Sequence, residues 1–301
     1  MTQGFTQPLP IPLPVSKGGT GLISLPALTQ ARLTLVTAVP VTVSDATAAT
    51  TLYYTPYQGN LISLYDGTRW NLFNLTEISI AIPATTSQMY DVFVYDNAGT
   101  PTLELVAWTN DTTRATTVAY LQGVIVKTGD NTRKYIGSIR TTTVSGQCED
   151  SQSKRYCYNN YNRVRRPMRV TETTDNWTYS TGAYRQANAN AANQLDFIQG
   201  TQEDSVQAFC IGDVVSSSGN VPVIVGIGLN STTAIASSCT NSVFYVSTNY
   251  VCPYASFTDF PQNGRQTLTW LEYGGGSATQ TWLGDNGSTT NLSGITGIIM
   301  A

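Results

Sequence analysis

The sequence predicts an all-β protein, and three observations support this class. Threonine, a β-branched residue that costs little in strands and loses side-chain freedom in helices, occurs 45 times in 301 residues. The chain also holds 17 tyrosines, 25 glycines and 13 prolines, which is typical of short strands joined by many turns. The longest apolar run, "VPVIVGIGL" at residues 221–229, has the length of a strand.

Composition excludes several functions. Charged residues make up 12% of the chain, about half the ~25% of ordinary soluble proteins, so uncharged polar groups must form the surface. The net charge of -3 gives no reason to expect nucleic-acid binding. No apolar run approaches the ~18 residues of a membrane span, and the start lacks the pattern of a signal peptide.

The absence of histidine removes Ser-His-Asp and Cys-His nucleophile systems as well as histidine-ligated zinc. The five cysteines form no C-x-x-C pair, and their odd number favours reduced thiols over a disulfide framework. We expect no cofactor, and the sequence leaves open whether a metal ion binds.

Residues 1–50 are expected to form an extended arm. Prolines at positions 8, 10, 12, 14, 26 and 40 exclude a regular helix or a central strand. The arm is too apolar for a solvated linker, which favours docking on another surface over the alternative of a disordered tail. The loop "SKGGTG" is not a P-loop, because Lys17 precedes the glycines and prolines replace the strand.

Residues 51–147 are expected to form a small antiparallel β domain built from hairpins. Asp66-Gly67 separates "LISLY" from "RWNLF", which is a two-residue hairpin signal. The stretch Asp96–Gly99 separates "DVFVY" from "TLELVAW", and Gly129–Asn131 marks a third turn.

Residues 148–163 are expected to form a short helical connector. Glu149, Asp150 and Ser151 suit a helix N-terminus, where unpaired N–H groups favour acceptors and negative charge. The spacing of Cys157, Tyr161 and Val164 then predicts one face of a helix over residues 151–161.

Residues 164–301 hold eight or more short strand patterns, which predict a β-sandwich knob of the jelly-roll type. No charged residue occurs between Asp213 and Asp259, and so long a neutral stretch indicates a core or an interface. The sequence therefore predicts an oligomer.

Basic residues gather in the middle of the chain, where 10 of the 16 fall between Arg133 and Arg185. The densest cluster consists of Arg163, Arg165, Arg166 and Arg169. Guanidinium forks of this kind bind anionic glycans or phosphates. The favoured alternative is that these arginines form ion pairs between chains or with the acidic C-terminal domain.

Two sets of residues resemble bacteriophage proteins. "PVSKGGTG" followed by "ARLTL" resembles a short repeat of phage tail-fibre proteins over about 20 residues, although Leu22-Ile23-Ser24 replaces the customary small residues and Thr34 an asparagine. "YYTPYQGNLISLYDGTRWNLF", "EDSQSKRYCYNNYNRVRRPMRV" and "NWTYSTGAYRQANA" look like a block, spanning about residues 50–200, of virion proteins described as tail fibres, minor tail proteins or head appendages.

The resemblance implies a virion protein that is assembled in the host cytoplasm. Appendages of this class are usually homotrimers, so the expected helix would form a three-fold collar. The arm would dock on other virion proteins of the tail or capsid. The docking residues implied are Ser16, Lys17, Gly18, Gly19, Thr20 and Gly21.

Three functions compete. The leading expectation is a non-enzymatic appendage whose C-terminal knob attaches to the host. A capsid decoration protein is the nearest alternative, and a polysaccharide-cleaving tailspike would need two carboxyls about 5–10 Å apart. The carboxylate candidates are Glu203, Asp204, Asp213, Glu272 and Asp285.

Binding of a host glycan without cleavage would use aromatic faces. Trp177, Tyr179 and Tyr184 are the candidates, together with Trp270 and Trp282. The alternative for each is that it fills the core or an interface, because aromatic side chains bury large areas.

Overall fold

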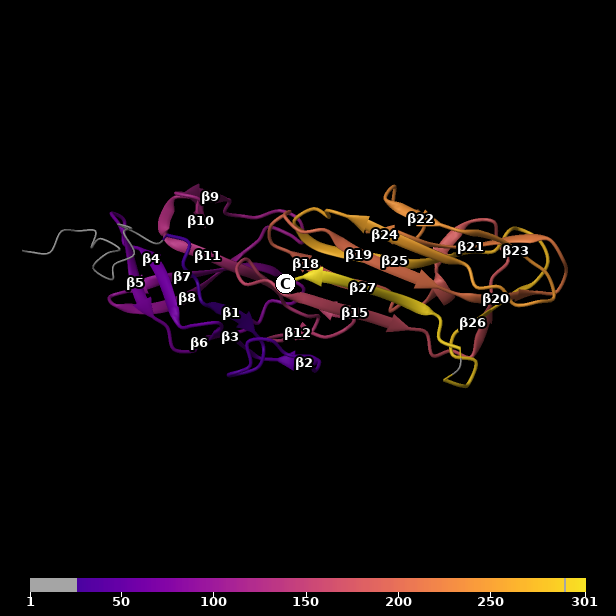
Figure 1. Ribbon diagram of the computed structural model, residues 1–301, viewed down its shortest axis with the longest axis horizontal. Coiled ribbons are helices and arrows are strands. Elements are labelled where there is room, and N and C mark those ends of the chain that lie inside the picture. Colours follow the sequence, from indigo (N-terminus) through magenta and orange to yellow (C-terminus); the bar gives the residue numbers. More distant parts are fainter. Residues whose placement is uncertain (1–25, 290) are drawn as a thin grey trace, which may run out of the picture.

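The computed structural model describes residues 26–289 and 291–301 and shows an elongated, all-β molecule (Figure 1). Within these ranges there is no α-helix, and the one helical turn is the 3-10 turn η2 (Ala187–Ala189). The described strand pairs are antiparallel except for that of β13 with β18. The all-β prediction is therefore confirmed.

Two small sheets lie toward one end of the long axis (Figure 1). One is the hairpin of β4 (Leu61–Tyr65) and β5 (Trp70–Asn74). The other has the order β1-β3-β6, formed by β1 (Ala31–Thr34), β3 (Thr51–Pro56) and β6 (Ile78–Ala81). Gln30 N donates to Leu61 O, and Ser63 N donates to Leu28 O, so the first described residues pair with β4.

A six-stranded sheet packs beside these two sheets, with the order β8-β7-β11-β10-β9. The long strand β11 pairs with β7 on one side and with both β10 and β14 on the other. Its strands are β7 (Met89–Asn97), β8 (Thr100–Ala107), β9 (Val118–Leu121), β10 (Val124–Lys127), β11 (Asp130–Arg140) and β14 (Cys157–Asn159).

The larger part of the molecule is a sandwich, and its first layer is an eight-stranded sheet with the order β2-β12-β13-β18-β25-β21-β23, in which β17 also pairs with β25. Its strands are β2 (Ala46–Ala49), β12 (Cys148–Asp150), β13 (Lys154–Arg155), β17 (Tyr184–Gln186), β18 (Gln194–Gln199), β21 (Val221–Leu229), β23 (Val243–Val246) and β25 (Gly264–Tyr273).

The second layer is a five-stranded sheet with the order β15-β27-β19-β24-β22. It consists of β15 (Arg165–Thr171), β19 (Val206–Ile211), β22 (Cys239–Asn241), β24 (Tyr254–Asp259) and β27 (Gly294–Met300). A three-stranded sheet, β16-β26-β20, lies toward the far end (Figure 1) and contains β16 (Asn176–Thr178), β20 (Asp213–Ser216) and β26 (Gln280–Leu283).

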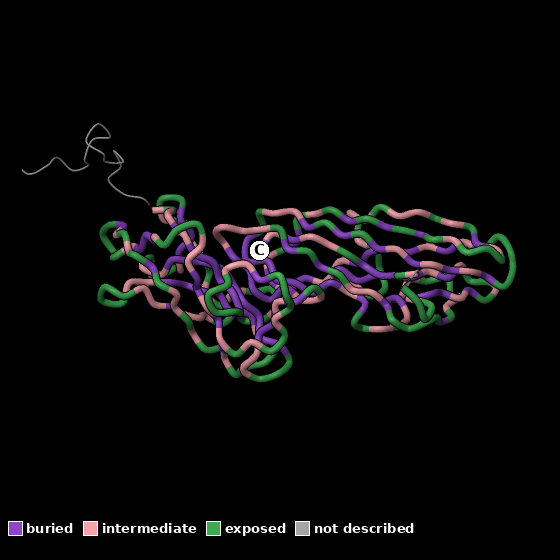
Figure 2. Tube along the Cα trace, turned by 60° about the horizontal axis from the view of Figure 1, so that its bottom comes forward, coloured by how far each residue is buried: buried purple, intermediate pink, exposed green. Residues whose placement is uncertain are grey.

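The core lies between the two sandwich layers and continues into the other end of the molecule. Buried positions alternate with more exposed ones along the sandwich strands (Figure 2). One hydrophobic cluster includes Leu33 on β1, Trp270 on β25 and Ile299 on β27. The packed antiparallel sheets are consistent with a β-sandwich, whereas the N-terminal arm, the jelly-roll topology, the trimer and the domain limits remain predictions.

The three hairpins expected from turn residues are confirmed. β4 and β5 pair across Asp66, whose carboxylate accepts hydrogen bonds from Thr68 N and Arg69 N. β7 pairs with β8, and β10 pairs with β11. Gly67, at φ +99°, supplies a left-handed backbone at the first turn, which a glycine adopts without strain.

The helix expected over residues 151–161 is wrong, because this segment contains β13 and β14. Residues 155–159 are buried consecutively, so both faces of an extended chain contact protein. Backbone groups pair with other strands, with Tyr156 N donating to Glu149 O and Arg140 N to Tyr156 O. Periodicity cannot distinguish a helix face from a strand that is buried on both sides.

The three residues of the expected helical collar consequently have different structural surroundings. Cys157 is buried opposite Ile139 of β11. The Tyr161 ring lies 5.1 Å from the amino nitrogen of Lys134. Val164 pairs its backbone with Ala301. The three residues therefore do not share a helical face.

Candidate functional site

The outer face of the five-stranded sheet carries exposed polar and aromatic side chains. Along β19, Val206, Ala208 and Cys210 point into the core, whereas Gln207 and Phe209 are exposed. Strand side chains alternate between the two faces, so the neighbouring strands also present every second residue outward. This face of the sheet is not covered by another part of the described chain, and we call it the outer face.

Strand register arranges the side chains of the outer face in rows. Residues that lie opposite one another on adjacent strands are neighbours on the same face. The first row is Arg169, Thr296, Phe209 and Ser256, and the second is Pro167, Ile298, Gln207 and Thr258. With strands roughly 4.8 Å apart, Arg169 and Phe209 are separated by about 10 Å across the sheet.

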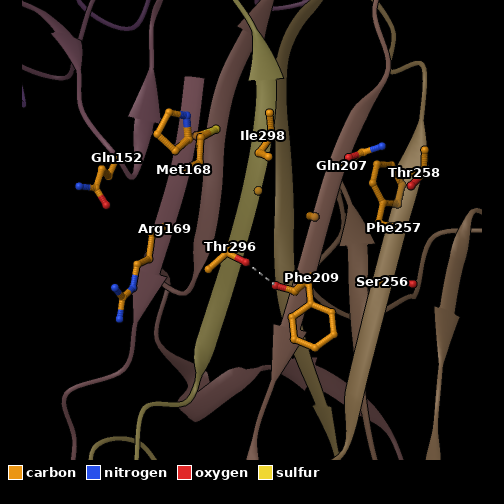
Figure 3. A pocket seen from close by; sticks show the side chains of 13 residues that line it. Gln152, Met168, Arg169, Gln207, Phe209, Ser256, Phe257, Thr258, Thr296 and Ile298 are labelled. Atoms are coloured by element: carbon orange, nitrogen blue, oxygen red, sulfur yellow. Dashed lines mark hydrogen bonds between the residues drawn. The ribbon is translucent and has the colours of Figure 1, made fainter. Parts of the chain in front are cut away.

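An open groove with a volume of about 640 Å³ follows these two rows (Figure 3). Figure 3 shows Arg169 and Phe209 on opposite sides of Thr296, whose hydroxyl donates to the Phe209 carbonyl at 3.5 Å. Gln152 and Gln207 contribute amide groups at the two sides of the groove. The groove therefore combines an aromatic ring with neutral hydrogen-bonding groups.

Phe209 and Tyr254 form an exposed aromatic pair on the outer face. Their ring centroids are 6.0 Å apart with an interplanar angle of 24°, and the two residues are 43% and 48% exposed. Phe244 meets Tyr254 edge-on, with centroids 6.4 Å apart. Half-exposed aromatic rings beside polar groups offer a ligand a flat apolar surface.

The charge of the outer face is positive. Arg165 and Arg169 are exposed on β15, and within residues 26–289 and 291–301 neither guanidinium has a hydrogen bond or an ion pair. The groove is lined by no carboxylate from the described part of the chain. No carboxylate of the described residues would therefore repel an anion bound in the groove.

The other two arginines of the predicted cluster bind carboxylates within the chain. Arg163 lies 2.7 Å from the carboxylate of Glu203 and 2.9 Å from that of Asp204. Arg166 is buried by the alternation of β15 and lies 2.8 Å from the carboxylate of Asp150. Of the four arginines, Arg163 and Arg166 therefore bind carboxylates, whereas Arg165 and Arg169 point outward from β15 without a partner in the described residues.

The predicted aromatic contacts lie elsewhere. Trp177 is 9% exposed and donates from Nε1 to the Glu272 carboxylate at 2.7 Å, so it belongs to the core rather than to a glycan platform. The guanidinium of Arg185 lies 3.8 Å from the Tyr179 ring centroid. Tyr184 is half-buried beside Tyr273, with centroids 5.3 Å apart, and Trp270 and Trp282 are fully buried.

The five candidate carboxylates of a tailspike do not line the groove. Glu272 is fully buried, where it accepts hydrogen bonds from Arg185 Nε and Asn188 N, and burial raises its pKa to about 7. Burial also raises the pKa of Asp213, which accepts from Asn291 at 2.8 Å. Asp285 accepts from Gly287 N, and Glu203 and Asp204 bind Arg163.

The arm motif falls only partly within the described residues. Ser16–Gly21 lie outside them. The second half of the motif, "ARLTL", forms β1, in which Arg32 is 2% exposed and its guanidinium donates to the carbonyls of Pro40, Asn162 and Ala301. This arginine therefore joins the start of the described chain to its C-terminal strand.

Two further observations concern other kinds of site. In the described ranges, no group of three or more cysteine, aspartate or glutamate side chains is placed to hold a metal ion. A search of the same residues finds no helix with the length and apolar character needed to span a membrane.

Sequence reasoning missed Phe209 and Tyr254. The strand "VQAFCI" is apolar on one face, and its other face carries Gln207, Phe209 and Ile211. A phenylalanine on the same face as the polar Gln207 was the available signal. It could not be used without knowing which face the second layer covers.

Comparison with known proteins gives little. No family model matches the sequence, and no curated protein matches it. Among solved structures, a tryptic core variant of Cry1Da from Bacillus thuringiensis aligns at a TM-score of 0.18 and 6% identity, covering 84% of this chain and 48% of that one. BuGH86wt in complex with neoagarooctaose aligns at 0.16 and 11%, covering 79% and 34%. Neither alignment supports a statement about function.

Proposed function

We propose that the chain is a structural protein of a bacteriophage virion, an appendage of tail-fibre or head-fibre type without enzymatic activity. Its N-terminal residues anchor it to tail or capsid proteins, and its sandwich faces the host surface. The likeness of "PVSKGGTG", of "ARLTL" and of the block at about residues 50–200 to phage virion proteins supports this role.

The observation that carries the proposal is the position of the outer face. The β4–β5 hairpin, with which Leu28 and Gln30 pair, lies at one end of the long axis, whereas the outer face belongs to the sandwich, which extends to the other end (Figure 1). Attachment through the N-terminal end would leave Phe209 and Tyr254 exposed. An appendage that contacts a host needs this separation of anchor and contact surface.

The appendage is a homotrimer in this proposal, and its sandwich has a jelly-roll arrangement. The low charge content and the neutral stretch between Asp213 and Asp259 support association between copies. Because β23 and β22 are edge strands, the trimer has unpaired backbone groups available along these edges.

Immunogold electron microscopy with antibodies against the purified chain tests the proposal. Label at the tail or at a single vertex of the virion is expected. Purified chain, added to host cells beforehand, should reduce phage adsorption. Label over the whole shell would instead make the chain a decoration protein, and unlabelled virions would overturn the virion role.

A further inference from the structure

The outer face has a combination of groups that fits one class of ligand, and the argument rests on the proposed role in host contact. Phe209 and Tyr254 offer flat apolar rings of the kind on which the C–H faces of sugars stack. Gln207 and Thr258 offer neutral donors and acceptors in the row beside Phe209. Uncharged amides and hydroxyls suit the hydroxyl groups of a polysaccharide.

Arg169 adds charge to the same row as Phe209. Its guanidinium is exposed and has no partner in the described residues, although a planar fork of donors binds carboxylates in a bidentate way. Arg165 lies on the same strand and the same face, four residues away. The face therefore complements a negative ligand at one side and a sugar ring at the other.

A second copy of the chain fits this face less well. Two copies meeting through the same face would bring together the Arg165 and Arg169 guanidiniums of both, and no carboxylate lines the groove to neutralise them. Like charges without partners disfavour such an interface. A two-fold contact of the outer face with itself is therefore disfavoured.

We propose that the outer face binds an acidic polysaccharide of the host surface. A sugar ring stacks on Phe209 and Tyr254, neighbouring hydroxyls bond to Gln207 and Thr258, and a sugar carboxylate binds Arg169. The roughly 10 Å between Arg169 and Phe209 matches contacts with successive sugars of one chain.

Isothermal titration calorimetry of the full chain tests this binding. The probes are fragments of polygalacturonate and of hyaluronate, with polygalacturonate fragments whose carboxyls have been reduced to alcohols as the neutral counterpart. Both acidic probes are expected to bind, roughly tenfold or more tightly than the reduced fragments, because one charge-assisted contact is lost in these. Added salt should weaken the acidic complexes most.

Matched variants assign the contacts. Arg169→Ala should weaken acidic fragments roughly tenfold and leave the reduced fragments unchanged, whereas Phe209→Ala should weaken both. The controls are Arg69→Ala, which removes an arginine whose side chain is 78% exposed on the β4–β5 hairpin, and Tyr120→Ala, which removes a 70% exposed aromatic on β9. Both controls should bind like the unmodified chain.

Several outcomes would overturn the inference. These are equal affinity for acidic and reduced fragments, no measurable binding of either acidic probe, or a loss of self-association in Phe209→Ala without any loss of glycan binding. The immunogold labelling of virions described above distinguishes a failure of this inference from a failure of the proposed function. Labelled virions with no glycan binding refute the acidic ligand alone, whereas unlabelled virions refute the proposed role whatever the calorimetry shows.

Discussion

The amino group of Lys134 lies inside the N-terminal part of the molecule, where it donates hydrogen bonds to three backbone carbonyls of the described residues. It donates to Pro26 O at 3.2 Å, Leu28 O at 3.0 Å and Ser63 O at 3.2 Å, and the residue is 1% exposed. Two of these carbonyls belong to the first described residues of the chain. Lys134 thus joins residues 26–28, which fall within the predicted arm, to β4 and β11.

This arrangement predicts a dependence of stability on pH. Burial lowers the pKa of Lys134 from its ordinary 10.5 to about 7, so between these values the unfolded chain holds a proton that the folded chain has released. The free energy of unfolding should therefore rise as the pH increases from about 7 toward 10.5. Thermal melts across this range check the direction.

Lys134→Met is the matched comparison for these melts. It keeps the length of the side chain and removes the titrating group. The buried thiols and phenols, whose pKa values burial raises, remain in both proteins, so the difference between the two pH profiles reports Lys134. Parallel profiles would show that this amino group does not titrate in the window.

At the scale of secondary structure, turn chemistry was the part of the fold best predicted from the sequence. Asp66-Gly67 and the other hairpin turns are local signals, because a positive φ or a side-chain bond to the next backbone N–H favours a turn wherever it occurs. The segment at residues 151–161 carries no such signal. Its strands exist because β11 and β18 supply partners from distant parts of the chain.

The candidate site depended on the same non-local information. The Arg163–Arg169 cluster was visible in the sequence, but only the register of β15 shows that Arg166 turns inward and Arg169 outward. Trp177 is a glycan-contact candidate in the sequence, with core filling as the alternative, and the hydrogen bond to Glu272 shows that it lies in the core. The sequence shows which side chains are present, but the pairing of the strands determines which of these side chains are exposed to solvent.

Close contact between strands gives a prediction at this scale. A Cβ on Gly137 of β11 would lie 2.1 Å from the carbonyl oxygen of Tyr158 on β14, which is backbone and cannot turn away. Gly137→Ala should therefore push β14 from β11 and lower the free energy of unfolding by roughly 1–3 kcal/mol. Urea denaturation measures the loss.

Gly219→Ala serves as the control for that measurement. A Cβ added to Gly219 would lie 3.8 Å from the Cβ of Ser247, which is an ordinary van der Waals contact. This variant should stay within about 0.5 kcal/mol of the unmodified chain. Equal destabilisation by the two alanines would show that β14 yields to the extra methyl group.

At the scale of the whole molecule, the two ends of the described chain meet inside it. Arg32 of β1 donates to the Ala301 carbonyl at 2.8 Å, although 269 positions separate them. The Asp111 carboxylate accepts from Arg140 of β11 at 2.8 Å and lies 3.7 Å from the guanidinium of Arg265 on β25. The N-terminal sheets and the sandwich therefore share ionic contacts at partly exposed side chains as well as one hydrophobic cluster.

Shared contacts of this kind predict that the two parts unfold together. Calorimetry of the full chain should show a single endotherm whose calorimetric and van't Hoff enthalpies agree. Asp111→Asn should lower the midpoint of that endotherm by a few degrees, because it removes the carboxylate that the buried Arg140 guanidinium binds, while Arg265 keeps the Asp196 carboxylate at 2.6 Å. Two endotherms, of which Asp111→Asn moves only one, would mean that the sheets before residue 148 and the sandwich unfold as separate units. The boundary predicted from the sequence near residue 148 would then also be a boundary between two cooperative unfolding units.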